Sequence, residues 1–309
     1  MDNIIFKNDS YPNLCNMSDN LCLKFDDDFD QLLENLPNSL HTLKLGSDFN
    51  QKLENLPNNL HTLKLGRDFN QKLENLPTLE LGFYPNQKLE NLPNSLHTLK
   101  LGFYFDQKLG NLPNSLHTLQ LGHRFDQKLE NLPDNLHTLK LFGYFNHKLK
   151  NLPNTLHTLH TLQLGYNFDK KLENLPNSLH TLQLGTCFNK KLENLPDNLH
   201  TLQLGSKFNK RLENLPNNLH TLELGYNFNQ KLKNLPDNLH TLSLGVSFNQ
   251  TLDNLPHGLN IFTISKHNNF INIDYLSDKY VTDMTYSCNY KIINIKGRRG
   301  MFIKSSNKF

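Results

Sequence analysis

The chain has 309 residues, of which 37% are hydrophobic, and a formal net charge of +3 from 32 basic and 29 acidic residues. The near-neutral balance argues against a nucleic-acid binder, because such proteins usually carry a marked basic excess. The low hydrophobic content is atypical of a compact domain and suits an elongated one whose units each bury a narrow strip.

The cysteines and the first residues indicate a cellular location. Cys15, Cys22, Cys187 and Cys288 show no CxxC spacing, which argues against a disulfide framework or a zinc site and suits a reducing compartment. The start, MDNIIFKNDS, lacks the features of a signal peptide, and no stretch approaches the roughly 18 apolar residues of a membrane span. We therefore expect a cytoplasmic protein with no membrane or nucleic-acid partner and no cofactor.

Residues 1–28 are predicted to form an N-terminal cap. The segment LCLKFDDDF, residues 21–29, looks like a degenerate first coil of the repeat that follows. A stack of repeats needs a cap at each end, since an end coil would otherwise expose an apolar face and an unpaired strand edge.

A repeat of about 20 residues occupies residues 29–270 and sets the fold class. Its phenylalanines recur at intervals of 20 residues, as at Phe29, Phe49 and Phe69, and the same interval returns further along the chain. A deletion after Phe69 and a duplication after Phe145 shift the count without ending the pattern. A column of interior phenylalanines is predicted, with the asparagine or aspartate after each one bonding the turn backbone.

Each unit also contains the pattern LxxLxL, as in Leu60, Leu63 and Leu65, which is typical of the strands of leucine-rich repeats (LRRs). About ten residues return to the next strand, which is too few for a helix of two turns, and Pro57 disfavours one. The predicted fold is mainly β: an LRR-like solenoid of ~20-residue coils with one short parallel strand per coil, an irregular convex side and capped ends.

Residues 271–309 are predicted to form a β-rich C-terminal cap with a basic tail. Just before it, LNIFTIS, residues 259–265, keeps the strand pattern but loses the histidine and glycine of the repeat. The later segment YVTDMTYSCNYKIINI alternates apolar and polar residues in places, as half-buried strands do. The sequence KGRRG near the end, with Lys296, Arg298 and Arg299, is expected to be a basic hairpin turn.

The repeat sequence FNQ-L--LPNSLHTL-LG--FNQ closely resembles the repeats of the FNIP repeat family, whose LRR-like members occur in social amoebae and giant DNA viruses. The resemblance covers roughly residues 20–270, and the family signature FNQPI is represented by FNQKL at residues 49–53. It implies an LRR-like fold and, for a viral protein, a location in the host cytoplasm. An F-box precedes the repeats in some members and implies substrate recruitment to a ubiquitin ligase, but residues 1–28 are too few for that helical module.

The recurring polar residues are interpreted as structural. A line of histidines offers no closure of three or four ligands about one point, as a zinc site requires, and no acidic residue shares the column to orient a base. We expect neutral imidazoles that bond backbone groups where the chain enters the strand, and no metal site. The single glycine after each strand is interpreted as a turn residue. The histidines are His41, His61, His97, His117, His137, His180, His200, His220 and His240.

Variation is concentrated in one strand column and in the two residues after the glycine. Because exposed aromatic residues and arginine are enriched in binding hot spots, these positions are predicted to bind a partner. The alternative is neutral drift, with the aromatic side chains lying along the apolar rim. The predicted partner-binding residues are Phe83, Tyr84, Phe103, Tyr104, His123, Arg124, Tyr144 and Tyr166, with Lys100, Gln120 and Lys140 on the strand face.

The sequence predicts a non-enzymatic module that binds another protein through its strand face or the adjoining loops. No nucleophile, paired carboxylates or metal cluster stands out from the repeat, so no catalytic residue is assigned. The alternatives are a self-associating structural scaffold and an F-box-free relative of ubiquitin-ligase substrate adaptors. A flat threonine-bearing face for ice or polysaccharide is a further reading, weakened by the long lysines and glutamines beside the threonines.

Overall fold

The computed structural model describes the repeat region and short segments beyond it. The described residues are 3–6, 21–54, 56–57, 59–60, 62–66, 68–69, 71, 78–81, 92, 94–149, 152, 158–250, 255–256, 258–259, 261–264, 281–287, 290–295 and 302–304. The chain forms two compact units, Met1–Phe145 with Asn151–Leu159, and Asn146–Lys150 with His160–Phe309.

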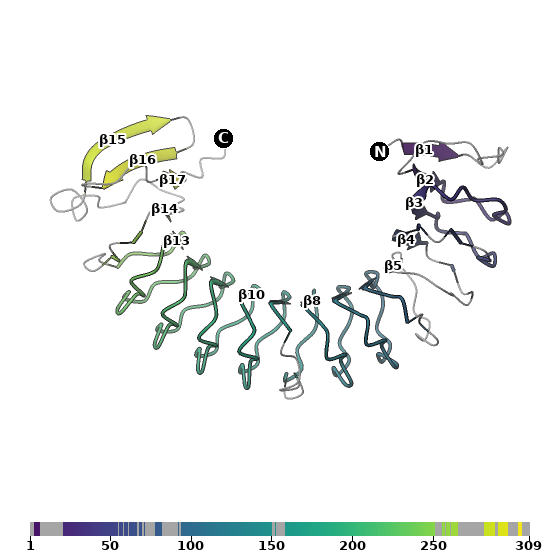
Figure 1. The fold of residues 1–309 in the computed structure, drawn as a ribbon. Helices are drawn as coiled ribbons and strands as arrows, with labels where there is room; N and C mark the ends of the chain where they lie inside the picture. The colour runs from purple at the N-terminus through teal and green to yellow at the C-terminus, as the bar shows by residue number, and fades with distance from the viewer. Residues whose placement is uncertain are drawn as a thin grey trace. The chain divides into compact units, whose positions relative to one another are not determined.

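The described residues of the first unit form eight short strands, each of which pairs in parallel with the next in the chain (Figure 1). Threonine pairs with threonine and leucine with leucine across most of these strand pairs, because successive coils repeat the same sequence. The strands are β1 (Asn3–Phe6), β2 (Leu21–Phe25), β3 (Leu40–Lys44), β4 (Thr62–Leu65), β5 (Thr78–Leu81), β6 (Thr98–Lys100), β7 (Thr118–Leu121) and β8 (Thr138–Leu141).

The second unit continues the same plan and adds a small antiparallel sheet. Its parallel strands are β9 (Thr161–Leu164), β10 (Thr181–Leu184), β11 (Thr201–Gln203), β12 (Thr221–Glu223), β13 (Thr241–Leu244) and β14 (Ile261–Ile264). The antiparallel sheet consists of β15 (Val281–Ser287), β16 (Tyr290–Ile295) and β17 (Phe302–Lys304), and β17 lies beside β14.

The predicted fold class is confirmed. The coils have one short parallel strand each, and the return segments contain no helix among the described residues. Strand β14 lies in the segment that keeps the strand pattern, and β15 and β16 lie in the alternating segment near the C-terminus. The boundaries at residues 28 and 270 stay predictions.

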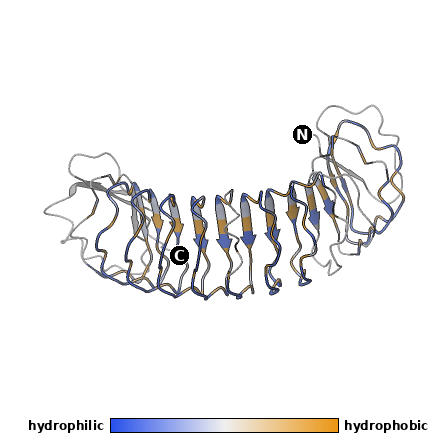
Figure 2. Cartoon of the chain, turned by 60° about the horizontal axis from the view of Figure 1, so that its bottom comes forward, coloured by the Kyte–Doolittle hydropathy of each residue, from blue (hydrophilic) through white to orange (hydrophobic). Residues whose placement is uncertain are grey.

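Alternation along the strands buries the leucines and leaves their neighbours half-exposed. In β10, Leu182 and Leu184 are buried, whereas Thr181 and Gln183 face outward, and the same pattern recurs in β7 and β13. Figure 2 shows the result as an orange band across the strands. Full burial of a leucine side chain contributes about 1.5–3 kcal/mol, so each coil gains most of its stability from its neighbours.

The predicted phenylalanine column is present in both units. In the second unit the rings from Phe168 to Phe248 are nearly parallel, with centroids 6.1 Å or 6.2 Å apart from coil to coil. This spacing exceeds the roughly 4.8 Å between paired strands, so the coils spread apart on the phenylalanine side. The strand side is therefore the concave side of the unit (Figure 1).

Two β-turns shape each coil, one before the strand and one after it. Before the strand, the N–H of a leucine such as Leu199 donates to the carbonyl of the proline three residues earlier, Pro196, at 3.1 Å. After the strand, the N–H of Phe208 donates to the carbonyl of Gly205 at 3.2 Å. The two residues between glycine and phenylalanine are therefore the central residues of an exposed turn.

The glycine after the strand is required by the neighbouring coil. A Cβ on Gly205 would lie 2.0 Å from the carbonyl oxygen of Gly185, and a Cβ on Gly225 would lie 2.3 Å from that of Gly205. Among the described glycines, Gly143 alone has a positive φ, of 59°. These glycines begin a turn, as predicted, but close approach of successive coils, and not backbone freedom, excludes a side chain at Gly205 and Gly225.

A backbone role for the asparagine in the sequence motifs ENLP and KNLP was not predicted. These asparagines have φ of 53° or 54°, the left-handed region that asparagine tolerates better than other residues with a Cβ. The recurrence of asparagine before Leu-Pro in successive repeats was the sequence signal that could have indicated this conformation. The asparagines are Asn35, Asn131, Asn174, Asn194, Asn214 and Asn234.

Candidate functional site

The central residues of the turns after β6, β7 and β8 are fixed to one another through the backbone. The N–H of Arg124 donates to the carbonyl of Phe103 at 2.9 Å, and the N–H of Tyr144 donates to the carbonyl of His123 at 2.8 Å. Since each turn is hydrogen-bonded to the one before it, side chains at equivalent positions lie above one another. The sequence variation at these positions is therefore displayed as a continuous surface.

The side chains of these turns form two rows of contacts. In the first row the His123 ring stacks on Phe103 on one side, with centroids 4.9 Å apart, and on Phe142 on the other, 5.8 Å apart. In the second row the guanidinium carbon of Arg124 lies 5.4 Å from the ring centroid of Tyr104 and 5.3 Å from that of Tyr144. Both distances fall within the range of a cation–π interaction.

The Phe103 and Tyr104 rings also meet edge to face, with centroids 4.9 Å apart, which joins the two rows into one cluster. We call the group Phe103, Tyr104, His123, Arg124, Phe142 and Tyr144 the aromatic–arginine cluster. His123, Arg124 and Tyr144 are exposed, with 48% of Tyr144 accessible to solvent, and Phe103 and Tyr104 are half-buried.

The structure brings together five of the predicted partner-binding residues in this cluster. Lys100, Gln120 and Lys140 lie half-exposed in register on β6, β7 and β8 of the same unit. Tyr166 is 56% exposed and belongs to the second unit. Phe83 and Tyr84 lie outside the described residues.

Phe142 is the member of the cluster that sequence analysis missed. In this coil the usual order after the strand is changed, so that Phe142 occupies the glycine position and Gly143 follows it. Gly143 adopts a φ of 59°, and a Cβ there would lie 2.1 Å from the carbonyl oxygen of His123. The exchange of glycine and aromatic residue in the sequence LFGYF was the available signal.

A charged group lies on the strand face of the first unit. The Glu80 carboxylate on β5 forms ion pairs with both Lys64 on β4 and Lys100 on β6. Burial alone would raise the pKa of Glu80, but hydrogen bonds from the two lysines and their charges outweigh it, so the pKa of this carboxyl is lowered. Lys100, a predicted partner-binding residue, thus already forms an ion pair with Glu80 within the molecule.

The histidines form a stacked column beside the strands. In the second unit the rings from His160 to His240 have centroids 4.9–5.1 Å apart. The Nδ1–H of His180 donates to the carbonyl of Ser178 at 2.6 Å, as the structural interpretation predicts, whereas the buried Nδ1 of His117 has no hydrogen-bond partner among the described residues. Burial and the neighbouring rings of His180 and His220 lower the pKa of His200. No group of three or more metal-ligating side chains occurs in the part of the chain that the structure describes.

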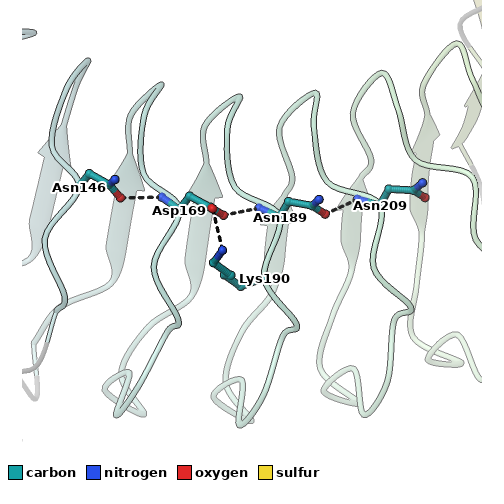
Figure 3. Close-up of polar contacts among 5 residues, drawn as sticks. All are labelled: Asn146, Asp169, Asn189, Lys190 and Asn209. Carbon is teal, nitrogen blue, oxygen red and sulfur yellow. Dashed lines mark hydrogen bonds and ion pairs between the residues drawn. The ribbon is translucent and has the colours of Figure 1, made fainter.

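The residue after each phenylalanine forms a second polar column (Figure 3). Its side-chain oxygen accepts a hydrogen bond from the backbone N–H of the equivalent residue in the next coil. These bonds run from Asp169 to Asn146 at 3.0 Å, from Asn189 to Asp169 at 2.9 Å and from Asn209 to Asn189 at 3.0 Å. This residue bonds the backbone, as predicted, but the bond is to the next coil and not to its own turn.

Lys190 adds a charge to this column. Its Nζ lies 2.7 Å from the second carboxylate oxygen of Asp169. Burial would raise the pKa of Asp169, but the hydrogen bonds from Lys190 and from the Asn189 backbone, together with the lysine charges, lower it. The column therefore has a structural function, since it connects the backbones of successive coils.

A family model described as FNIP Repeat matches most of the repeat region. The matched residues are 49–84, 85–124, 108–142, 145–187, 188–227 and 228–267, which together make up more than half of the chain. The comparison with curated proteins gives no match. No helix among the described residues is long and apolar enough to cross a membrane.

The solved structures that are similar to this chain include two LRR-type proteins. One is CroV588, described as a circular LRR protein, which is 29% identical with a TM-score of 0.52 over 99% of this chain and 60% of that one. The other is YopM from Yersinia enterocolitica WA-314, which is 22% identical with a TM-score of 0.50 over 81% of this chain and 59% of that one. The second likeness shows the fold alone. The chain therefore spans about 60% of the length of these relatives.

Proposed function

Since this chain belongs to the FNIP repeat family and folds as an LRR-like solenoid, we propose that it is a non-enzymatic module that binds another protein. Repeat solenoids of this kind commonly serve as protein-interaction modules, because stacked coils provide an extended surface of fixed spacing. The aromatic–arginine cluster of the first unit is the observation that supports the proposal.

The composition of the cluster suits a protein interface. Tyrosine, phenylalanine and arginine are enriched in protein interfaces, tyrosine and arginine are common hot-spot residues, and here all three lie on adjacent turns. The contacts of Arg124 with Tyr104 and Tyr144 fix its position before a partner arrives. Pre-organisation of this kind lowers the entropy cost of association.

The chemistry of Arg124 indicates how a partner would be held. The rings of Tyr104 and Tyr144 lie near the guanidinium, whose N–H groups are the donors that pair with carboxylates or backbone carbonyls. The flanking aromatic rings would provide apolar contact area around that polar centre. The site is proposed to bind a protein surface with an acceptor group at its middle.

An intracellular setting forms part of the proposal. Cys22 is a buried free thiol and Cys187 is a half-buried one, as is usual for proteins of reducing compartments.

The test is affinity capture from the native host cell with three forms of the chain. The wild type is compared with the variant Tyr104→Ala/Arg124→Ala/Tyr144→Ala. The matched control is Lys108→Ala/Lys128→Ala/Lys148→Ala, which changes three exposed residues of the same coils on their return segments. We expect a protein that the wild type and the control retain and the cluster variant loses. Equal recovery of every captured protein with all three forms would refute the proposal.

The main alternative is a structural scaffold that self-associates. Light scattering over a range of concentrations separates the two functions, since a recognition module stays monomeric and a scaffold forms ordered oligomers. Capture of ubiquitin-ligase subunits by the wild type would instead favour the adaptor alternative.

A further inference from the structure

The second unit carries a furrow along its strand face that is separate from the aromatic–arginine cluster. Its volume is about 500 Å³, and it extends across the five successive strands β9 to β13. Leucines at the ends of the strands or directly after them, such as Leu224, line the furrow together with glycines that follow them, such as Gly225. Because these leucines are buried, they leave the space of the furrow to the polar side chains beside them.

One side of the furrow is a row of polar side chains held in register by the sheet. Gln163, Gln183, Gln203, Glu223 and Ser243 occupy equivalent positions on β9 to β13. Each glutamine amide provides both hydrogen-bond donors and an acceptor, which are the groups needed to pair with the N–H and C=O of a peptide backbone. The row is therefore suited to a main chain and does not demand particular side chains.

The part of the furrow at β12 differs from the rest, because it carries a charged residue and an aromatic ring. Among the described residues that line it, Glu223 alone is charged, and its carboxylate makes no ion pair within the described chain. Tyr226, from the turn that follows the same strand, also lines the furrow and is 46% exposed. A carboxylate and an aromatic ring together favour a cationic side chain, through an ion pair and a cation–π contact.

The length of the furrow matches a short extended segment. Five strands at a spacing of about 4.8 Å span about 19 Å, which corresponds to about six residues of extended chain at ~3.3 Å per residue. We propose that the furrow binds an extended polypeptide segment whose main chain runs along the glutamine row and whose one basic side chain lies at Glu223 and Tyr226. Nucleic acid does not fit this site, since its phosphates would meet a carboxylate and no cation.

The test uses a library of acetylated and amidated hexapeptides. Each sublibrary fixes arginine, lysine, glutamate or alanine at one position and fills the others with uncharged residues. The immobilised full chain should retain the arginine and lysine sublibraries at least about fivefold better than the glutamate ones. The same chain is also exposed to an array of neutral oligosaccharides.

Matched variants locate the site. Glu223→Gln and Tyr226→Ala should each reduce the preference for basic peptides by about three- to tenfold. Glu213→Gln and Lys231→Ala, which change exposed residues of the same unit outside the furrow, should leave the preference unchanged. All four variants must show the melting temperature of the wild type, since the residues are partly or fully exposed. Arg124→Ala should keep the preference, which separates this site from the cluster.

The proposal is overturned by several outcomes. These are the absence of retained peptide, an equal or greater retention of glutamate peptides, and a basic preference that survives Glu223→Gln. Retention of neutral oligosaccharides in place of peptides would assign the furrow to another class of ligand. Loss of the preference in Arg124→Ala would place the peptide at the cluster instead.

Discussion

The guanidinium carbon of Arg124 lies 5.3 Å from the ring centroid of Tyr144, and the same guanidinium lies 5.4 Å from the ring of Tyr104. Each ring belongs to a neighbouring coil, so the cation lies between two repeats. We predict that Arg124→Gln lowers the free energy of unfolding by about 1 kcal/mol, because an exposed cation–π contact contributes about 0.5–1 kcal/mol. Arg124→Lys should recover part of this loss, since an ammonium group also binds a ring face. Urea denaturation followed by circular dichroism measures both, and equal stability of the three proteins would contradict the arrangement.

Phe208 tests the interior column. Its ring is fully buried and stacks on Phe188 and Phe228 at 6.1 Å on either side. We predict that Phe208→Ala costs about 3–5 kcal/mol, because the cavity that it leaves adds to the lost burial. Tyr166→Ala, at an exposed position of the same unit, should change stability by no more than about 0.5 kcal/mol. A similar loss in both variants, measured by urea denaturation, would show that the phenylalanines are not the core.

Asn209 tests the polar column. Its side-chain oxygen accepts the N–H of Asn229 at 2.9 Å and also the amide of Gln230 at 3.0 Å. We predict that Asn209→Ala destabilises the protein by about 1–2 kcal/mol, because the Asn229 N–H loses its acceptor. Asn209→Asp keeps an acceptor, as Asp169 does at the equivalent position, and should be close to neutral. Thermal melts of the two variants that coincide would contradict a specific hydrogen bond.

The histidine column predicts a dependence of stability on pH. The pKa of His200 is lowered in the folded protein by burial and by the rings of His180 and His220. The unfolded chain then binds more protons in the histidine range, so stability is fully present above a pH of about 6.5 and falls as the pH drops through the folded pKa. The melting temperature at about pH 5 should be lower than at about pH 7.5, and His200→Gln should reduce the difference. An unchanged melting temperature would show that the stacked rings do not repel when protonated.

Much of the fold could be predicted because the sequence itself shows the 20-residue repeat and the alternation of apolar and polar residues in each strand. The spacing of Leu60, Leu63 and Leu65 predicts which side chains are buried, and the 20-residue interval of the phenylalanines predicts that they stack. The reason for the glycine column could not be predicted in this way. It depends on how closely Gly205 approaches Gly185, and that distance is a property of two coils, which no single repeat encodes.

The candidate site was predicted in composition but not in geometry. The variable positions after the glycine were recognised, yet nothing in the sequence shows that Arg124 lies between two tyrosines or that His123 lies between two phenylalanines. Those contacts follow from the backbone hydrogen bonds that hold the turns in register. The furrow was missed as a site because only Lys100, Gln120 and Lys140 of the variable strand column were assigned to partner binding.

The central claim is that the exposed turns of the aromatic–arginine cluster recognise a partner protein. The most direct test is isothermal titration calorimetry of the captured partner with the wild type, Arg124→Ala and Lys128→Ala. An arginine that acts as a hot spot contributes about 2 kcal/mol or more, so we predict that Arg124→Ala weakens binding about thirtyfold or more. Lys128→Ala, on the return segment of the same coil, should bind within about twofold of the wild type. Equal affinity of all three proteins would contradict the account.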